Sequence, residues 1–267
     1  MFAEGLITFR ETLEAALIVG IILAYLEKTG NAKLNRHIYL GVALGLFASV
    51  IVAVLFSYIA GGFVGRNEQL FEGSVMLFAA FLISWMILWM LKQERLRAEI
   101  EGIVHVKISK GETLGLVLFT AVAVWREGTE TVIFLGATAF SNGGLALLGA
   151  ILGVAGALAL AFVLFETAMR VNLKLFFQGT SVLLILFAAG LVAYSVHEFQ
   201  EAGVLPEQEP LWSTKGMLDQ KSGIGAVARS LFGYADSPTA FEIVAYLLYF
   251  ALIFVAYRNI KLLYRFI

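Results

Sequence analysis

The sequence predicts an all-α polytopic membrane protein with seven transmembrane helices, arranged as an inverted 3+3 helix repeat plus one extra C-terminal helix. Hydrophobic residues make up 60% of the chain and charged residues only 15%, against about 45–50% and about 25% in soluble domains. Apolar stretches of about 20 residues, the length that spans a bilayer, recur along the sequence. One charged motif and two glycine-containing patterns also occur twice, in the same order.

Each expected span is a mostly apolar stretch bounded by polar or glycine-rich residues. The seven stretches are, in chain order, Leu6–Leu26, Ile38–Ala60, Leu70–Leu91, Leu114–Phe140, Leu145–Phe165, Leu175–Val196 and Phe241–Leu263. We expect turns at the glycine pairs Gly61-Gly62 and Gly143-Gly144. The first span is expected to be retained rather than cleaved as a signal peptide, because charged residues interrupt its apolar run and no basic region precedes it.

An internal repeat relates spans one to three to spans four to six. The matching segments are Arg10-Glu11 with Arg126-Glu127, Leu40-Gly41-x-x-Leu44-Gly45 with Leu148-Gly149-x-x-Leu152-Gly153, and Phe71-Glu72-Gly73 with Phe177-Gln178-Gly179. A unit of three spans ends on the opposite side from its start, so the second unit is inverted, as in many secondary transporters. We therefore expect one transmembrane domain over 1–267, with repeats at 1–92 and 113–198, an external loop at 199–240, and the last span and tail at 241–267.

The distribution of basic residues predicts the orientation in the membrane, because Lys and Arg concentrate in cytoplasmic loops. The loops after spans one, three and five, together with the C-terminal tail, hold 13 of the 19 Lys and Arg residues. This bias predicts a multi-pass protein of the cytoplasmic (inner) membrane, with its N-terminus outside and its C-terminus in the cytoplasm. The loop before the last span is then external, either as an ordered loop or short helix over the mouth or as a plain connector.

Two motifs of the form Arg-Glu-x-x-Glu lie inside apolar spans, and we call residues 10–14 the first motif and residues 126–130 the second motif. Near a helix centre each ionisable side chain costs about 2.5–3.5 kcal/mol to insert, so all six would cost roughly 15–20 kcal/mol if they faced lipid. The charges must therefore face inward. Spacings of three and four residues place the two carboxylates and the arginine of each motif on one helical face.

The facing motifs are expected to bind a hard metal cation through carboxylate oxygens. The predicted metal ligands are Glu11, Glu14, Glu127 and Glu130, supported by Arg10 and Arg126. The alternative is a pair of self-neutralising ion-pair clusters that only hold helices in register. No catalytic residue and no permanently bound cofactor is expected, and the absence of cysteine excludes disulfides, thiolate ligands and iron–sulfur clusters.

A second set of polar residues falls at the expected outer end of the spans, and it comprises Glu72, His197, Glu198 and Glu201. We expect these residues to form an acidic entrance that concentrates cations. The segment that starts at His197 superficially resembles a zinc-protease helix, but the second histidine of that motif is replaced by Glu201. Solvated helix ends are the plainer interpretation of the same residues.

Paired Arg-Glu-x-x-Glu motifs in spans one and four of a seven-span chain resemble the oxidase-dependent iron permease family, including its bacterial EfeU-type branch. The family pattern is Arg-Glu-Gly-Leu-Glu, and this chain has Thr12 and Thr129 where the pattern has Gly and Leu. The segment from Phe71-Glu72-Gly73 to Trp89-Met90 and the segment that ends span six at His197-Glu198-x-x-Glu201-Ala202-Gly203 are also similar to the family.

The resemblance covers the whole chain and implies a high-affinity permease with iron as transported substrate and the motif glutamates as its ligands. It also implies an extracytoplasmic iron-binding or oxidising partner protein, with membrane lipid as surroundings and no nucleic acid. The residues alone leave three alternatives: a transporter of another metal such as manganese, zinc or lead, an intramembrane enzyme that uses the paired glutamates as acid and base, and a structural subunit.

Overall fold

The computed structural model describes residues 2–90, 96–142, 147–166, 173–220 and 223–263, and these residues form α-helices and no strand. In this part of the chain there are nine helices and one short 3-10 turn. The helices are α1 (Phe2–Lys28), α2 (Asn35–Ala60), α3 (Arg66–Met90), α4 (Leu96–Ser109), α5 (Thr113–Asn142), α6 (Leu147–Glu166), α7 (Leu173–Glu201), α8 (Gly223–Phe232) and α9 (Ala240–Leu263). The predicted all-α class is confirmed.

All seven expected spans fall on long helices, namely α1, α2, α3, α5, α6, α7 and α9. Five of them, α2, α3, α6, α7 and α9, are long and apolar enough to cross a membrane. Helices α1 and α5 have the length as well, but each contains one of the charged motifs in its apolar sequence. The predicted turn at Gly61-Gly62 is present, whereas the turn at Gly143-Gly144 and the span ends at Leu91 and Leu145 lie outside the described residues.

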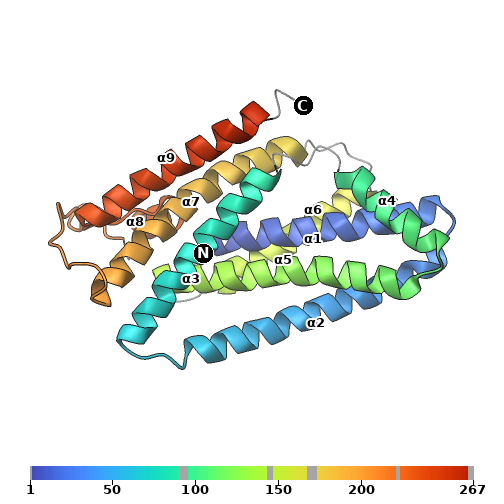
Figure 1. Ribbon diagram of the computed structural model, residues 1–267, viewed down its shortest axis with the longest axis horizontal. Helices are drawn as coiled ribbons and strands as arrows, with labels where there is room; N and C mark the ends of the chain where they lie inside the picture. Colours follow the sequence, from blue (N-terminus) through green and yellow to red (C-terminus); the bar gives the residue numbers. More distant parts are fainter. Residues whose placement is uncertain (1, 91–95, 143–146, 167–172, 221–222, 264–267) are drawn as a thin grey trace.

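The helices pack in pairs that join the first half of the chain to the second. Helix α2 packs along α5, α1 along α6, and α3 along α7, while α1 and α5 also contact each other. The pairs are symmetric between the halves. If α1, α2 and α3 are exchanged with α5, α6 and α7 respectively, the same four pairs result. Figure 1 shows α1 and α5 running in opposite directions through the bundle, which brings the middle of one beside the middle of the other.

Two glycine contacts set the spacing of these helix pairs. A Cβ atom at Gly45 of α2 would lie 2.7 Å from the carbonyl oxygen of Ala121 in α5, and a Cβ atom at Gly153 of α6 would collide with Gly5 and Thr8 in α1. Only glycine allows backbones to approach this closely. The two contacts use equivalent positions of the sequence repeat, so the same interface is built twice.

The charged motifs lie between two apolar clusters. The cluster nearer the start of α1 gathers buried side chains of α1, α3, α5, α7 and α9, including Ile7, Ile83 and Phe134. The other cluster joins Ile22, Leu26, Ile38, Ile100, Val104 and Leu116 from α1, α2, α4 and α5. On α1, residues 10–14 fall between Ile7 and Ile22, so the motif is enclosed by apolar packing on both sides.

The described residues of the segment before α9 include a short helix, α8. Helix α8 packs against α7, and its Arg229 donates a hydrogen bond to the backbone carbonyl of Ser141 at the end of α5. The same guanidinium lies 4.3 Å from the centre of the Tyr194 ring. Helix α7 also continues to Glu201, beyond the predicted span end at Val196, so Glu201 belongs to the helix rather than to the loop expected at 199–240.

A candidate cation site between α1 and α5

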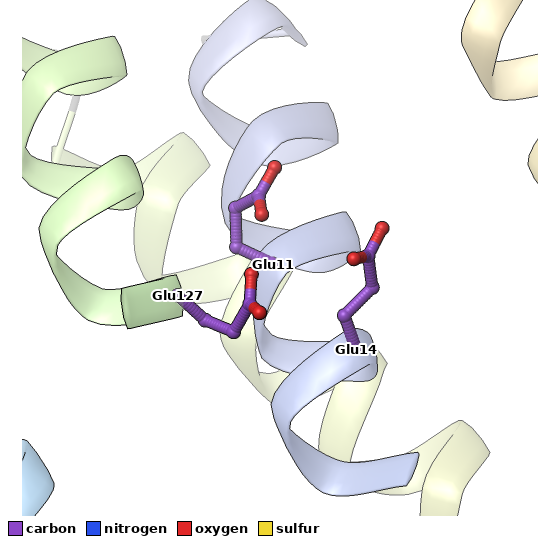
Figure 2. A group of neighbouring side chains, drawn as sticks. All are labelled: Glu11, Glu14 and Glu127. Carbon is purple, nitrogen blue, oxygen red and sulfur yellow. The ribbon is translucent and has the colours of Figure 1, made fainter. Parts of the chain in front are cut away.

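Three of the four predicted ligands converge between α1 and α5. One carboxylate oxygen each from Glu11, Glu14 and Glu127 lies within 4.8 Å of the other two. Figure 2 shows Glu127 reaching from α5 towards α1, from which Glu11 and Glu14 project. This is the only group of three or more His, Cys, Asp or Glu side chains with such spacing among the described residues. Glu11 and Glu14 of the first motif therefore lie opposite Glu127 of the second.

Arg10 lies wholly inside the protein, with 0% of its side chain exposed. One terminal nitrogen of its guanidinium is 2.9 Å from Glu14 Oε1 and the other is 3.5 Å from Glu11 Oε1. The nitrogen that faces Glu11 also donates a hydrogen bond to Met86 Sδ on α3 at 2.8 Å. The predicted pairing of Arg10 with Glu14 four residues later is present, and a single arginine holds both carboxylates of the first motif.

Arg126 occupies the equivalent position of the second motif, but 48% of its side chain is exposed. It forms an ion pair with Glu127, and its Nε lies 3.6 Å from Glu130 Oε1. Its guanidinium carbon lies 5.5 Å from the centre of the Trp89 ring on α3, which is within reach of a cation–π interaction. Trp89 of α3 thus contacts the second motif.

Glu130, the fourth predicted ligand, is outside the group of three converging oxygens. Its recorded ion-pair partner is Arg126, and 20% of its side chain is exposed. The structure therefore places Glu130 at the edge of the site.

Two oxygens of the site are buried with neither a hydrogen-bond donor nor an ion-pair partner in the described part of the chain. They are Glu11 Oε2 and Glu127 Oε2, one from each motif. A buried polar group without a partner costs about 1–3 kcal/mol, and a charged group costs more. The two motifs together contain four Glu and two Arg, which is a net charge of minus two when all are ionised. A bound cation would compensate both the missing hydrogen bonds and the charge.

The residues expected at the entrance form a separate group around the end of α7. His197 Nδ1 lies 3.0 Å from Glu242 Oε1 on α9, and His197 Nε2 lies 3.2 Å from Glu201 Oε1. Gln69 on α3 donates a hydrogen bond to Glu201 Oε2 at 3.1 Å. Both ring nitrogens of His197 therefore face carboxylates, and the histidine joins α7 to α9 rather than presenting a free ligand atom.

Glu72 and Glu198, the other two entrance residues, form no side-chain hydrogen bond or ion pair with any described residue. Neither belongs to the converging oxygens between α1 and α5. Within the described ranges the entrance residues also do not form a second group with metal-ligand spacing. These side chains supply negative charge near the end of α7, not a second metal centre.

Sequence reasoning missed three residues that contact these sites, namely Met86, Trp89 and Glu242. Each lies far along the chain from the residue it contacts, so no local spacing connects the two. Only Glu242 could have been suspected from the sequence. It is a carboxylate near the start of an apolar helix, where a buried charge needs an ion-pair or hydrogen-bond partner.

Long apolar helices that enclose paired charged motifs define a multi-pass membrane protein of the transporter class. Comparison with known proteins gives the family. The model of the iron permease FTR1 family matches residues 1–267, and the chain therefore belongs to this family. It is a permease rather than an enzyme, and its family transports iron.

Two relatives show the extent of the similarity. The chain is 35% identical over 254 residues to the ferrous iron permease EfeU of Escherichia coli O6:K15:H31 (strain 536 / UPEC), which covers 93% of this chain and 92% of that protein. It is 32% identical over 254 residues to the ferrous iron permease EfeU of Yersinia pestis, covering 93% and 90%. No solved structure matches the chain significantly.

Proposed function

We propose that this protein carries iron across the cytoplasmic membrane through a site formed by Glu11, Glu14 and Glu127, with Glu130 at its edge. The observation that supports this site most directly is the convergence of three carboxylate oxygens from both motifs within 4.8 Å. Ion–oxygen distances of about 2.0–2.6 Å place the ligands of one ion up to about 4–5 Å apart. The three oxygens thus have the spacing of ligands to a single ion. Ferrous iron is the proposed form, because both relatives are named ferrous iron permeases.

The proposed architecture has seven spans, with α1 to α3 and α5 to α7 as inverted repeats and α9 outside the repeat. The exchange of helix pairs between the halves supports this arrangement, as do the equivalent glycine contacts at Gly45 and Gly153. The opposite directions of α1 and α5 in Figure 1 agree with inversion. The iron site then lies where the repeats meet, as in other transporters of this design.

The outer end of the pathway is proposed to be the acidic group around α7. Glu72 and Glu198 attract cations, while His197 and Gln69 hold Glu201 in position. Negative charge at a mouth raises the local concentration of cations and speeds their encounter with the site. An extracytoplasmic iron-binding or oxidising protein is the proposed source of iron at this end.

Uptake into proteoliposomes tests the proposed function. Purified protein is reconstituted, and uptake is measured for Fe(II) kept reduced, for chelated Fe(III), and for manganese, zinc and lead. We expect Fe(II) uptake above that of empty liposomes and of a Glu127→Gln variant reconstituted at equal density. Equal iron uptake by wild type and empty liposomes would refute transport, and equal uptake by wild type and Glu127→Gln would refute the site.

Thiol labelling tests the proposed orientation, because the chain contains no cysteine. A cysteine is introduced at the exposed Ser213, in the segment before α9, or at the exposed Lys33, in the turn between α1 and α2. We expect an impermeant reagent to label position 213 in intact cells and position 33 only after the membrane is opened. The reverse pattern would invert the proposed topology.

A further inference from the structure

A thioether lies beside the carboxylates of the proposed iron site. Met86 of α3 is buried, and its Sδ accepts a hydrogen bond of 2.8 Å from one terminal nitrogen of Arg10. The same nitrogen is 3.5 Å from Glu11 Oε1. One positively charged nitrogen therefore lies between the sulfur of Met86 and an oxygen of the proposed site.

This hydrogen bond stabilises the buried guanidinium only weakly. A thioether is a weak acceptor, whereas carboxylates form the strong bonds of arginine. Glu11 nonetheless keeps one buried oxygen without a donor in the described part of the chain, while the nearby nitrogen is shared with sulfur. Packing does not require sulfur here, because Ile83 and Ile87 fill neighbouring buried positions of α3 with hydrocarbon. The arginine nitrogen thus lies where a cation could bind, between the soft thioether sulfur of Met86 and the hard carboxylate oxygen of Glu11.

We propose that Met86 is a specificity-determining ligand of the transported ion. When the ion binds the oxygens of Glu11 and Glu14, Arg10 moves away from Met86, and the thioether completes the coordination. This inference rests on the proposed function, and it predicts that the site prefers ferrous iron to the harder Mn²⁺. Carboxylates alone suit Mg²⁺, Ca²⁺ and Mn²⁺, whereas a thioether favours softer ions, and Fe²⁺ binds most ligand sets more tightly than Mn²⁺.

Competition between metals in proteoliposomes tests this role, with Met86→Leu as the variant because leucine keeps a similar apolar volume. Met76→Leu is the matched control, since Met76 is a fully buried methionine of the same helix in the apolar cluster around Ile83. We expect Met86→Leu to raise the Fe(II) concentration for half-maximal uptake about tenfold, the low end of the effects of altering a metal's surroundings. Mn(II) uptake should stay unchanged, and Met76→Leu should keep the wild-type preference.

Three results would overturn the role of Met86. An unchanged Fe(II)-to-Mn(II) preference in Met86→Leu would show that sulfur does not select the ion. A parallel loss of Fe(II) and Mn(II) uptake would show that Met86 only supports Arg10. If wild-type protein moves no iron, the proposed function itself fails, which is a distinguishable outcome.

X-ray absorption at the iron edge provides a direct readout that needs no substitution. Wild-type protein labelled with selenomethionine and loaded with Fe(II) should show a selenium neighbour of the iron. The signal should persist in labelled Met76→Leu and disappear in labelled Met86→Leu. A first shell of oxygen alone in wild-type protein would refute Met86 as a ligand even if the leucine variant cannot be purified.

Discussion

The two motifs share one sequence pattern but lie in different surroundings. Arg10 is wholly buried, whereas almost half of the Arg126 side chain is exposed. The first motif supplies two of the three converging oxygens and the second motif supplies one. Helix α3 touches both arginines through residues one turn apart, with Met86 on Arg10 and Trp89 on Arg126.

The same sequence motif can therefore lie in two different environments within one protein. Within each motif the spacing sets which side chains can pair, and both expected arginine–glutamate pairs are present. Exposure is set by the neighbouring helices, which are not symmetric around the two motifs. The arginine of the first motif is therefore enclosed, whereas that of the second motif is half exposed.

The largest expected effect comes from removing carboxylates. Gln keeps the shape of Glu but removes its charge and a hard ligand, so Glu11→Gln, Glu14→Gln and Glu127→Gln should each abolish iron uptake. Glu130→Gln should also reduce uptake, but less, because Glu130 lies outside the converging group. Initial uptake rates at equal amounts of inserted protein provide the measurement. Near-normal rates in all four variants would make the motifs structural.

The next largest effect is a difference in folding stability between variants of Arg10 and variants of Arg126. Replacing Arg10 by Gln leaves two buried carboxylates uncompensated, which costs about 3–5 kcal/mol. Arg126→Gln also leaves the buried Glu127 without its cation, but the lost guanidinium is half exposed, so this variant should cost less than Arg10→Gln. Unfolding in detergent, followed by tryptophan fluorescence, compares the two variants. Equal losses would show that the difference in exposure has no energetic consequence.

The Lys variants of the same two positions refine this comparison. Lysine keeps the charge but lacks the planar fork that holds two carboxylates at once. We therefore expect Arg10→Lys and Arg126→Lys to lose uptake even where the folded protein persists. Full uptake by Arg10→Lys would show that charge alone suffices in the enclosed half.

The smallest expected effect concerns the entrance. Replacing both Glu198 and Glu201 by Gln should weaken uptake chiefly at low metal concentration, and the wild-type advantage should shrink as salt screens the charges. Glu72→Gln should also lower the maximal rate, since Glu72 lies within α3 and we propose that it passes the ion inward. Uptake curves at two ionic strengths provide the test. A loss of maximal rate in the double variant as severe as in Glu127→Gln would place Glu198 and Glu201 in the central site.

Much of the fold follows from the sequence because bilayer length and apolar composition are local properties. The seven expected spans fall on the seven long helices of the described residues. The end of α7 was placed too early, at Val196, because the helix continues with polar residues beyond the apolar stretch.

The finer geometry of the site depends on contacts between helices, which the spacing of residues along the sequence does not predict. All four glutamates were expected as ligands, yet Glu130 is at the edge, where it is paired with Arg126. Met86 and Trp89 approach the arginines only because the tertiary fold brings α3 beside both motifs. Glu242 meets His197 only because α9 packs on α7. Such partners emerge from tertiary packing.

The glycine contacts have a consequence for chimeric proteins made from relatives. Gly45 of the first half holds α5, which bears the second motif, and Gly153 of the second half holds α1, which bears the first motif. Each half therefore aligns the charged residues of the other. A half taken from a relative brings its own motif, but the glycine that positions this motif lies in the other half. We therefore expect activity only when both halves come from the same protein.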